Sequence, residues 1–150
     1  MSSTYVRNQF DTWIRANSAE ANIIDLTAMY SELEIMLADK LIGRNDPWLA
    51  LQYIGSNEEA VALSANNATG KYRENGSVFV HIVARVSTTV YDDILVRTEA
   101  FRNLLRGQRI NDILVESVTP PNFESGATLQ FEGGYQSASV IVNYQRDLSL

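Results

Sequence analysis

The fold of this chain is decided by residues 77–87, which read SVFVHIVARVS. Along this stretch one face carries only apolar side chains: Val78, Val80, Ile82, Ala84 and Val86. The other face is mixed, since Phe79 and Val83 share it with His81 and Arg85. Alternation with a period of two and many β-branched residues is typical of a strand with one face on a core. This is the clearest strand that the sequence predicts.

A helix is predicted directly after this strand, over residues 89–106. Its apolar positions recur every three or four residues: Val90, Ile94, Thr98, Phe101, Leu104 and Leu105. Thr88 or Thr89 can cap the start of the helix, and Gly107 suits its end. Such a stripe predicts a helix that packs one side against the sheet.

Further strands are predicted on both sides of this unit. They cover residues 110–119, 136–146 and 48–54, the last with a weaker hairpin partner at 59–63. Gly55, Ser56 and Asn57 have the composition of a turn between those two. Residues 64–76 are polar and rich in Asn and Gly, which predicts a long loop.

The N-terminal third contains one clear element and one open segment. Helical spacing of Val6, Phe10 and Ile14 predicts a helix over residues 1–16. Residues 17–47 allow two readings. Residues 23–26 have the composition of a short strand, whereas the S-x-x-E spacing from Ser31 predicts a short helix over 32–41.

Together these elements predict one α+β domain over residues 1–150. Residues 48–147 are predicted to form a mostly antiparallel sheet together with the helix 89–106. The helices are expected to cover one face of this sheet. A chain of 150 residues usually forms a single core. At 45% hydrophobic residues, the composition is too apolar for disorder.

Composition also excludes several classes of function. The chain has no cysteine, so disulfide and thiolate chemistry are ruled out. Its formal net charge of -6 and its lack of a basic tail argue against a nucleic-acid-binding surface. No run is long and apolar enough for a membrane span, and the charged Arg7 and Asp11 argue against a signal peptide. We expect synthesis and folding in the cytoplasm of the producing cell.

The sequence predicts no catalytic, cofactor or metal site. His81 is the only histidine and is expected to be structural. Gly70-Lys71 lacks the rest of a phosphate-binding loop. The carboxylate pairs Asp92-Asp93 and Glu58-Glu59 are expected to serve a helix first turn and a solvated turn. We therefore predict a protein that is not an enzyme.

Two groups of residues are candidates for protein contacts. Arg102, Arg106 and Arg109 recur at helical spacing and are expected to share a helix side or its C-terminal end. They form either a solvated end with favourable charge, or a basic stripe that meets an acidic neighbouring subunit or passing DNA phosphate. The second group is the predicted loop 67–76, either a contact loop or a loop without a partner. Its candidate contact residues are Lys71, Tyr72, Arg73 and Glu74.

With its elements in this order, the chain resembles the tail terminator, or tail-completion, proteins of long-tailed bacteriophages. Four features carry the resemblance: the N-terminal amphipathic helix; Pro47-Trp48 at the start of a strand; residues 70–82, GKYRENGSVFVHI, which lead into a capped helix; and Gly133-Gly134-Tyr135 before the last strand. The resemblance covers residues 45–147 well and the first helix loosely.

The resemblance implies a structural virion protein of the tail and neck. Proteins of this family form a homo-hexameric ring that caps the tail tube, ends its polymerisation and joins the tail to the head connector. Genomic DNA passes through the lumen without sequence-specific binding. The implied partners are the tail-tube protein, the connector protein and further copies of the chain, with no membrane and no cofactor.

Two alternatives remain open at this stage. Another head–tail joining protein, a minor tail protein or a tail-tube subunit would have a related α+β build. A small ligand-binding or enzymatic α+β domain would instead need an apolar pocket with convergent polar groups. His81, Arg85 and Tyr144 are the residues expected to line such a pocket.

Overall fold

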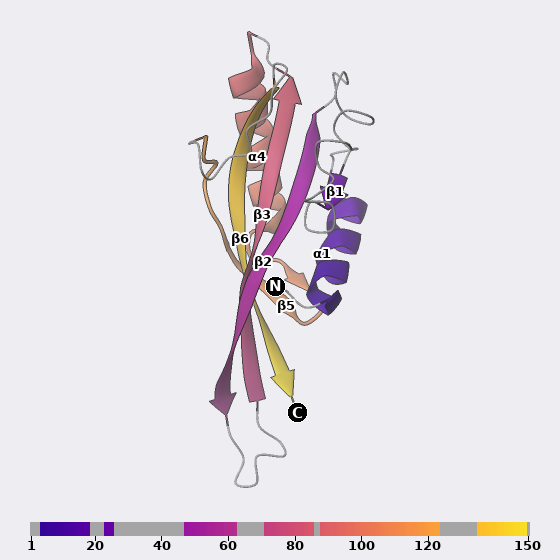
Figure 1. The fold of residues 1–150 in the computed structure, drawn as a ribbon, viewed down its shortest axis with the longest axis vertical. Coiled ribbons are helices and arrows are strands. Elements are labelled where there is room, and N and C mark those ends of the chain that lie inside the picture. The colour runs from indigo at the N-terminus through magenta and orange to yellow at the C-terminus, as the bar shows by residue number, and fades with distance from the viewer. Residues whose placement is uncertain are drawn as a thin grey trace.

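The protein's structure, a computed structural model, describes residues 4–18, 23–25, 47–62, 71–85, 88–123 and 135–149. The described elements are α1 (Thr4–Asn17), β1 (Ile23–Asp25), β2 (Trp48–Ala62), β3 (Lys71–Arg85), α4 (Val90–Leu105), β4 (Arg109–Ile110), β5 (Ile113–Val118) and β6 (Tyr135–Ser149). The strands form one curled sheet in the order β1-β2-β3-β6-β5-β4 (Figure 1). Only β1 and β2 pair in parallel; the other described pairs are antiparallel. A single small α+β domain is thereby confirmed.

Both helices begin and end close to the predicted bounds. The apolar spacing of α1 buries Val6, Phe10 and Ile14, which lie on one side of that helix. The start of α4 differs in one detail from the prediction. Thr89 stands at the N-cap position but its side chain makes no cap hydrogen bond there; instead its hydroxyl donates to the Asp93 carboxylate at 3.2 Å.

The core follows the alternation of residues 77–87. Val80 of β3 lies between its Cα partners Leu51 of β2 and Val140 of β6, and all three are fully buried. The neighbouring rows repeat this pattern, because Cα partners of antiparallel strands point to the same face. The buried side chains of α1 and α4 belong to the same apolar cluster as these strand residues.

Two predictions about the middle of the chain are wrong. Gly55, Ser56 and Asn57 do not form a turn, because β2 continues through them to Ala62 with a shift in register between Tyr53 and Ser56. The hairpin partner of β2 is therefore β3 rather than residues 59–63. The second error concerns the predicted loop 64–76, since residues 71–76 form the first part of β3. Its other residues lie outside the described ranges.

Other predictions are refined by the structure. The predicted strand 110–119 is divided at Asn111, which has a positive φ of 54°, so β4 and β5 form a tight hairpin. The last strand is longer than predicted, with fifteen residues. In the open segment 17–47, residues 23–25 form β1, as the strand reading expected, whereas the predicted helix 32–41 lies outside the described residues.

Three strands extend well beyond both helices and form a projecting arm (Figure 1). We define the arm as residues 56–62 of β2, 71–76 of β3 and 144–149 of β6, with β3 in the middle. At its base the arm still contacts the body, since Glu74 and Tyr144 are buried and β5 pairs with residues 144–146. Beyond this base the strands project away from the helices (Figure 1). The arm is therefore the part of the described chain best placed to meet a partner.

Candidate interaction surface

The arm has a long strand edge on one side. β1 pairs with β2 only at Leu49–Leu51, so from Ser56 onward the outer edge of β2 has no strand partner among the described residues. Strand edges of this kind leave N–H and C=O groups directed outward and readily pair with another chain. This edge is consequently a candidate contact surface.

A cluster of charged and polar side chains fixes the base of the arm to the body. Arg146 of β6 donates from Nε to Asp112 at 2.9 Å, and its Nη1 lies 3.7 Å from a carboxylate oxygen of Glu74. The same guanidinium lies 4.0 Å from the ring centroid of Tyr5 in α1. Tyr5 in turn donates its hydroxyl to Asp112 at 2.8 Å. One arginine thus joins the helix, the β4–β5 turn and two strands of the arm.

The electrostatics of this cluster favour the ionised carboxylate. Burial alone would raise the pKa of Asp112, but the hydrogen bonds from Arg146 and Tyr5 outweigh burial and lower that pKa. The hydrogen bond to Asp112 raises the pKa of the Tyr5 hydroxyl, which remains a proton donor. Glu74 is only 5% exposed, and Arg146 supplies the cation that it needs.

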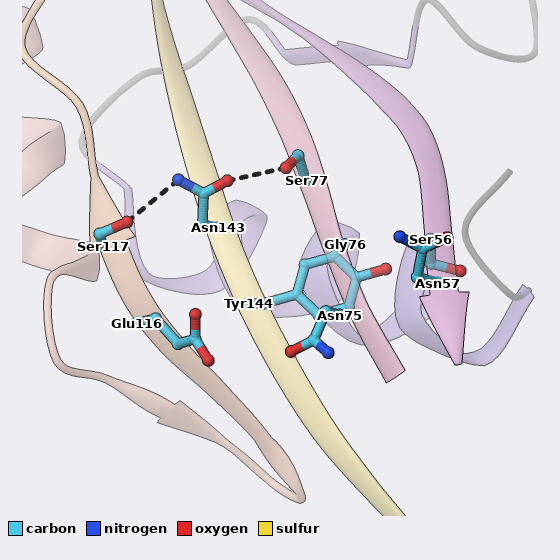
Figure 2. A pocket seen from close by; sticks show the side chains of 9 residues that line it. All are labelled: Ser56, Asn57, Asn75, Gly76, Ser77, Glu116, Ser117, Asn143 and Tyr144. Atoms are coloured by element: carbon cyan, nitrogen blue, oxygen red, sulfur yellow. Dashed lines mark hydrogen bonds between the residues drawn. The ribbon is translucent and has the colours of Figure 1, made fainter. Parts of the chain in front are cut away.

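A glycine lets an aromatic ring pack directly against the backbone of β3 where the arm begins. Gly76 and Tyr144 are Cα partners, and the Tyr144 ring lies across Gly76 (Figure 2). A Cβ atom at position 76 would come within 2.5 Å of the ring carbon Cζ of Tyr144. Any larger residue would push away Tyr144, which is buried against Phe10 of α1 with ring centroids 5.4 Å apart. Gly76 is therefore a packing residue of the arm base, not part of a mobile loop.

A polar groove of about 510 Å³ crosses the sheet at the same level. Its lining comes from four strands: Ser56, Asn57, Asn75, Gly76, Ser77, Glu116, Ser117, Asn143 and Tyr144. Across it, Ser77 donates to the Asn143 amide oxygen at 2.7 Å, and the Asn143 amide donates to Ser117 at 3.0 Å (Figure 2). Such a row of amides and hydroxyls can form hydrogen bonds with another polar surface but offers little apolar area to a small molecule.

His81 belongs to a second polar row. Its Nδ1 lies 2.6 Å from the Ser139 hydroxyl and its Nε2 lies 3.2 Å from the Gln52 side-chain oxygen. The simplest assignment has Ser139 donating to Nδ1 and Nε2–H donating to Gln52. Burial lowers the pKa of His81 to about 4, so the ring is neutral at pH 7.

This row has the order of a nucleophile, a base and an orienting group, but its surroundings favour a structural role. Ser139 is 3% exposed, and both its backbone N–H and its C=O are bonded to Asn122. The orienting group is the neutral Gln52 rather than a carboxylate, so it stabilises a histidine cation poorly. The row ties three strands together across a buried part of the sheet.

The four residues predicted in the loop 67–76 lie on β3, in the middle strand of the arm. Tyr72 and Arg73 are half-buried. Arg73 bonds through Nε to Asp147 of β6 at 2.9 Å. Glu74 is buried and paired, so it is not an accessible contact residue. For Lys71 only the backbone position is described, opposite Ser149.

The three predicted arginines are not equivalent in the structure. Arg102 donates to Glu99 at 3.1 Å and to the Val118 carbonyl oxygen at 3.2 Å, which occupies its guanidinium. Arg106 follows the last residue of α4, and Arg109 begins β4. Both are exposed. The C-terminal end of α4 thus presents two accessible cations, not a stripe of three.

The alternative ligand site does not assemble as expected. His81 and Tyr144 lie on opposite faces of the sheet, because Tyr144 shares the core face with Val78 and Val142. Only the backbone of Arg85 is described. Among the described ranges there is no group of three or more potential metal ligands. The same ranges contain no helix with the length and hydrophobicity to cross a membrane.

Sequence reasoning missed the residues that hold the base of the arm. Arg146 and Asp112 lie 34 positions apart, and neither forms part of a motif. Asn75-Gly76 does stand out in the sequence at the base of the arm, but its composition is that of a turn and predicts a loop. In the structure the glycine is explained by its cross-strand partner Tyr144.

Comparison with models of known protein families gives no match, and comparison with curated proteins gives none either.

Proposed function

We propose that this protein is a structural protein of a bacteriophage virion that forms a ring at the end of the tail tube. The ring would end polymerisation of the tube and join the tail to the head connector. The proposal rests on the resemblance described above and on one structural observation, the projecting three-stranded arm with its unpaired edge.

The arm supports a ring because its edge needs a partner. Beyond Ser56, β2 is bounded by another strand on one side only, within the described part of the chain. The exposed side chains described on this edge, Asn57 and Glu58, are polar or charged, so they suit a contact with a hydrated protein surface. A contact between this edge and a different surface of the next copy would be head-to-tail. Such contacts form a ring where the rotation between copies closes, and an open filament where it does not.

We further propose that α1 and α4 pack on the same face of the sheet. Their buried side chains join the single apolar cluster built by one face of β2, β3 and β6. The opposite face carries the hydrogen-bonded rows around Asn143 and His81. The His81 row is buried, so in a ring the accessible surfaces would be the part of this face around Asn143 and the arm.

The partners follow from the proposed position. They are further copies of the chain, in a hexameric ring, together with the tail-tube and connector proteins. Genomic DNA would cross the lumen without being held, which suits a chain with a formal net charge of -6. The protein would be made in the host bacterial cytoplasm and end up in the virion neck.

The solution mass of the purified protein tests this proposal, measured by light scattering with negative-stain images of the same sample. We expect a closed ring, or a monomer that becomes a ring when tail tubes are added. Long tubes would identify a tube subunit instead. A monomer or dimer that ignores tail tubes would contradict the ring.

A further inference from the structure

We propose that the ring interface joins the acidic edge of the arm in one copy to the arginine end of α4 and β4 in the next. The two surfaces are centred on Glu58 of β2 and on Arg106 with Arg109. This inference rests on the proposed ring and specifies which surfaces of two copies meet.

The first surface carries an uncompensated negative charge. Glu58 is exposed and has no ion-pair partner among the described residues. It is the Cα partner of Glu74, and directly opposed residues of antiparallel strands point to the same side. Arg146, the next member of this row, already serves both Glu74 and Asp112. Arg146 is therefore shared by two carboxylates already, and no described ion pair joins it to Glu58, which leaves Glu58 open to a cation from outside.

The second surface carries the complementary charge. Arg106 donates to the Asn103 side-chain oxygen at 2.9 Å, which is a neutral partner, and Arg109 is exposed at the start of β4. Neither has a carboxylate partner within the described ranges, whereas Arg15, Arg73, Arg102 and Arg146 each do. One carboxylate, that of Glu116, lies on the adjacent strand β5 and would moderate this field.

The positions of the two surfaces suit a ring. β2 flanks the arm on one side, and β4 is the last strand at the other end of the sheet. A contact between them uses two different surfaces of the same chain, so it is head-to-tail and repeats from copy to copy. Opposite charges at the two ends would also set the direction and register of the contact.

Charge exchange between copies tests the inference. Two variants are compared: Glu58→Arg, and the double variant Arg106→Glu with Arg109→Glu. Each alone should raise the protein concentration needed for half-assembly at least tenfold, because like charges would then meet. An equimolar mixture of the two variants should restore the ring mass if the variants alternate around the ring. The cation introduced at position 58 of one copy would then face the two carboxylates introduced in the next. Asp92→Arg is the matched control. It makes the same charge change in the first turn of α4, away from the arm, and should assemble like the unmodified chain.

The outcomes separate this interface from the proposed function. If the unmodified chain forms rings and the charge variants do so equally well, the ring stands and this interface is wrong. If each variant fails to assemble and the mixture fails as well, while circular dichroism shows folded protein, the two surfaces do not meet each other and the inference is overturned. If the unmodified chain never forms a ring, with or without tail tubes, the proposed function fails and the interface fails with it.

Discussion

Arg146 connects three parts of the molecule. It bonds Asp112, faces Glu74 and covers the Tyr5 ring, so its removal affects α1, the β4–β5 turn and the arm together. The energetic weight of the cluster comes from Glu74, because a buried carboxylate without a cation is expensive. The cluster is therefore expected to be needed for the arm to keep its orientation.

Replacing Arg146→Met should lower the free energy of unfolding by roughly 3 kcal/mol, since the buried Glu74 would lose its cation. Urea denaturation followed by circular dichroism measures this change. Arg15→Met is the matched control, because the exposed pair of Arg15 with Asp11 is worth only about 0.5 kcal/mol. The double variant Glu74→Met with Arg146→Met should recover part of the loss. Equal losses in the single and double variants would show that Glu74 is not the reason.

His81 makes stability depend on pH in a defined direction. Its pKa is about 4 in the folded protein against 6.5 in an unfolded chain, so the unfolded state binds more protons between these values. The free energy of unfolding is therefore unaffected by His81 protonation above pH 6.5. It decreases as the pH falls from 6.5 towards 4, because protons bind the unfolded chain first. We expect a loss on the order of 3 kcal/mol over this range, at up to about 1.4 kcal/mol per pH unit.

The control for this prediction is His81→Gln, which can bond to Ser139 and Gln52 but does not titrate. Both proteins keep Asp112, whose lowered pKa also makes stability fall in acid, so only the difference between the two curves reports on His81. Denaturant titrations at several pH values between 4 and 7 give this difference. Parallel curves would mean that His81 is accessible to protons in the folded state.

At the scale of elements, the sequence predicted those parts whose stability is local. The helices α1 and α4 and the core alternation of β3 follow from spacing alone, because each buries a periodic apolar face. The length of β2 did not follow, since Gly55-Ser56-Asn57 has the composition of a turn. A register shift takes up this irregular stretch, and pairing with β3 carries the strand onward.

The arm could not be predicted from the sequence either, because its strands depend on pairing with distant residues rather than on a local apolar pattern. Residues 71–76 have few apolar side chains, and no core alternation marks them as a strand. What stabilises them is cross-strand pairing, including the ion pairs of Arg73 with Asp147 and of Glu74 with Arg146. Those partners lie more than 70 positions away in the sequence. The predicted contact residues could thus be named, but not their places on a rigid strand.

Contact of the middle strand of the arm with the tail tube remains a prediction. Tyr72→Ala with Arg73→Ala should leave the fold intact, because the exposed pair of Arg73 with Asp147 contributes about 1 kcal/mol or less. Binding to tail tubes in a sedimentation assay should fall at least tenfold. The matched control is Val96→Ala with Asp92→Ala on the exposed side of α4, away from the arginine end. Unchanged binding, or unchanged tail length on complementation, would count against the contact.

For the whole molecule, two electrostatic effects would act on the proposed ring in opposite directions. Each copy carries a formal net charge of -6, so neighbouring copies repel one another. At centre-to-centre distances of about 30 Å, expected for this chain length, that repulsion is roughly 2 kcal/mol per contact in about 10 mM salt. Near 150 mM salt the screening length is about 8 Å, and the repulsion becomes negligible. The proposed attraction of Glu58 for two arginines of the next copy would act over a few ångströms and be weakened only at much higher salt.

Ring formation should therefore be strongest near physiological salt and weaker at both extremes, about 10 mM and about 1 M. Light scattering over a salt series measures the concentration at half-assembly. Glu58→Gln should remove the weakening at high salt, because no charge pair is left to screen, and should keep the weakening at low salt, since the net charge changes only from -6 to -5. Assembly that strengthens steadily up to 1 M salt would mean that apolar contacts, not the acidic edge and the arginine end, hold the copies together.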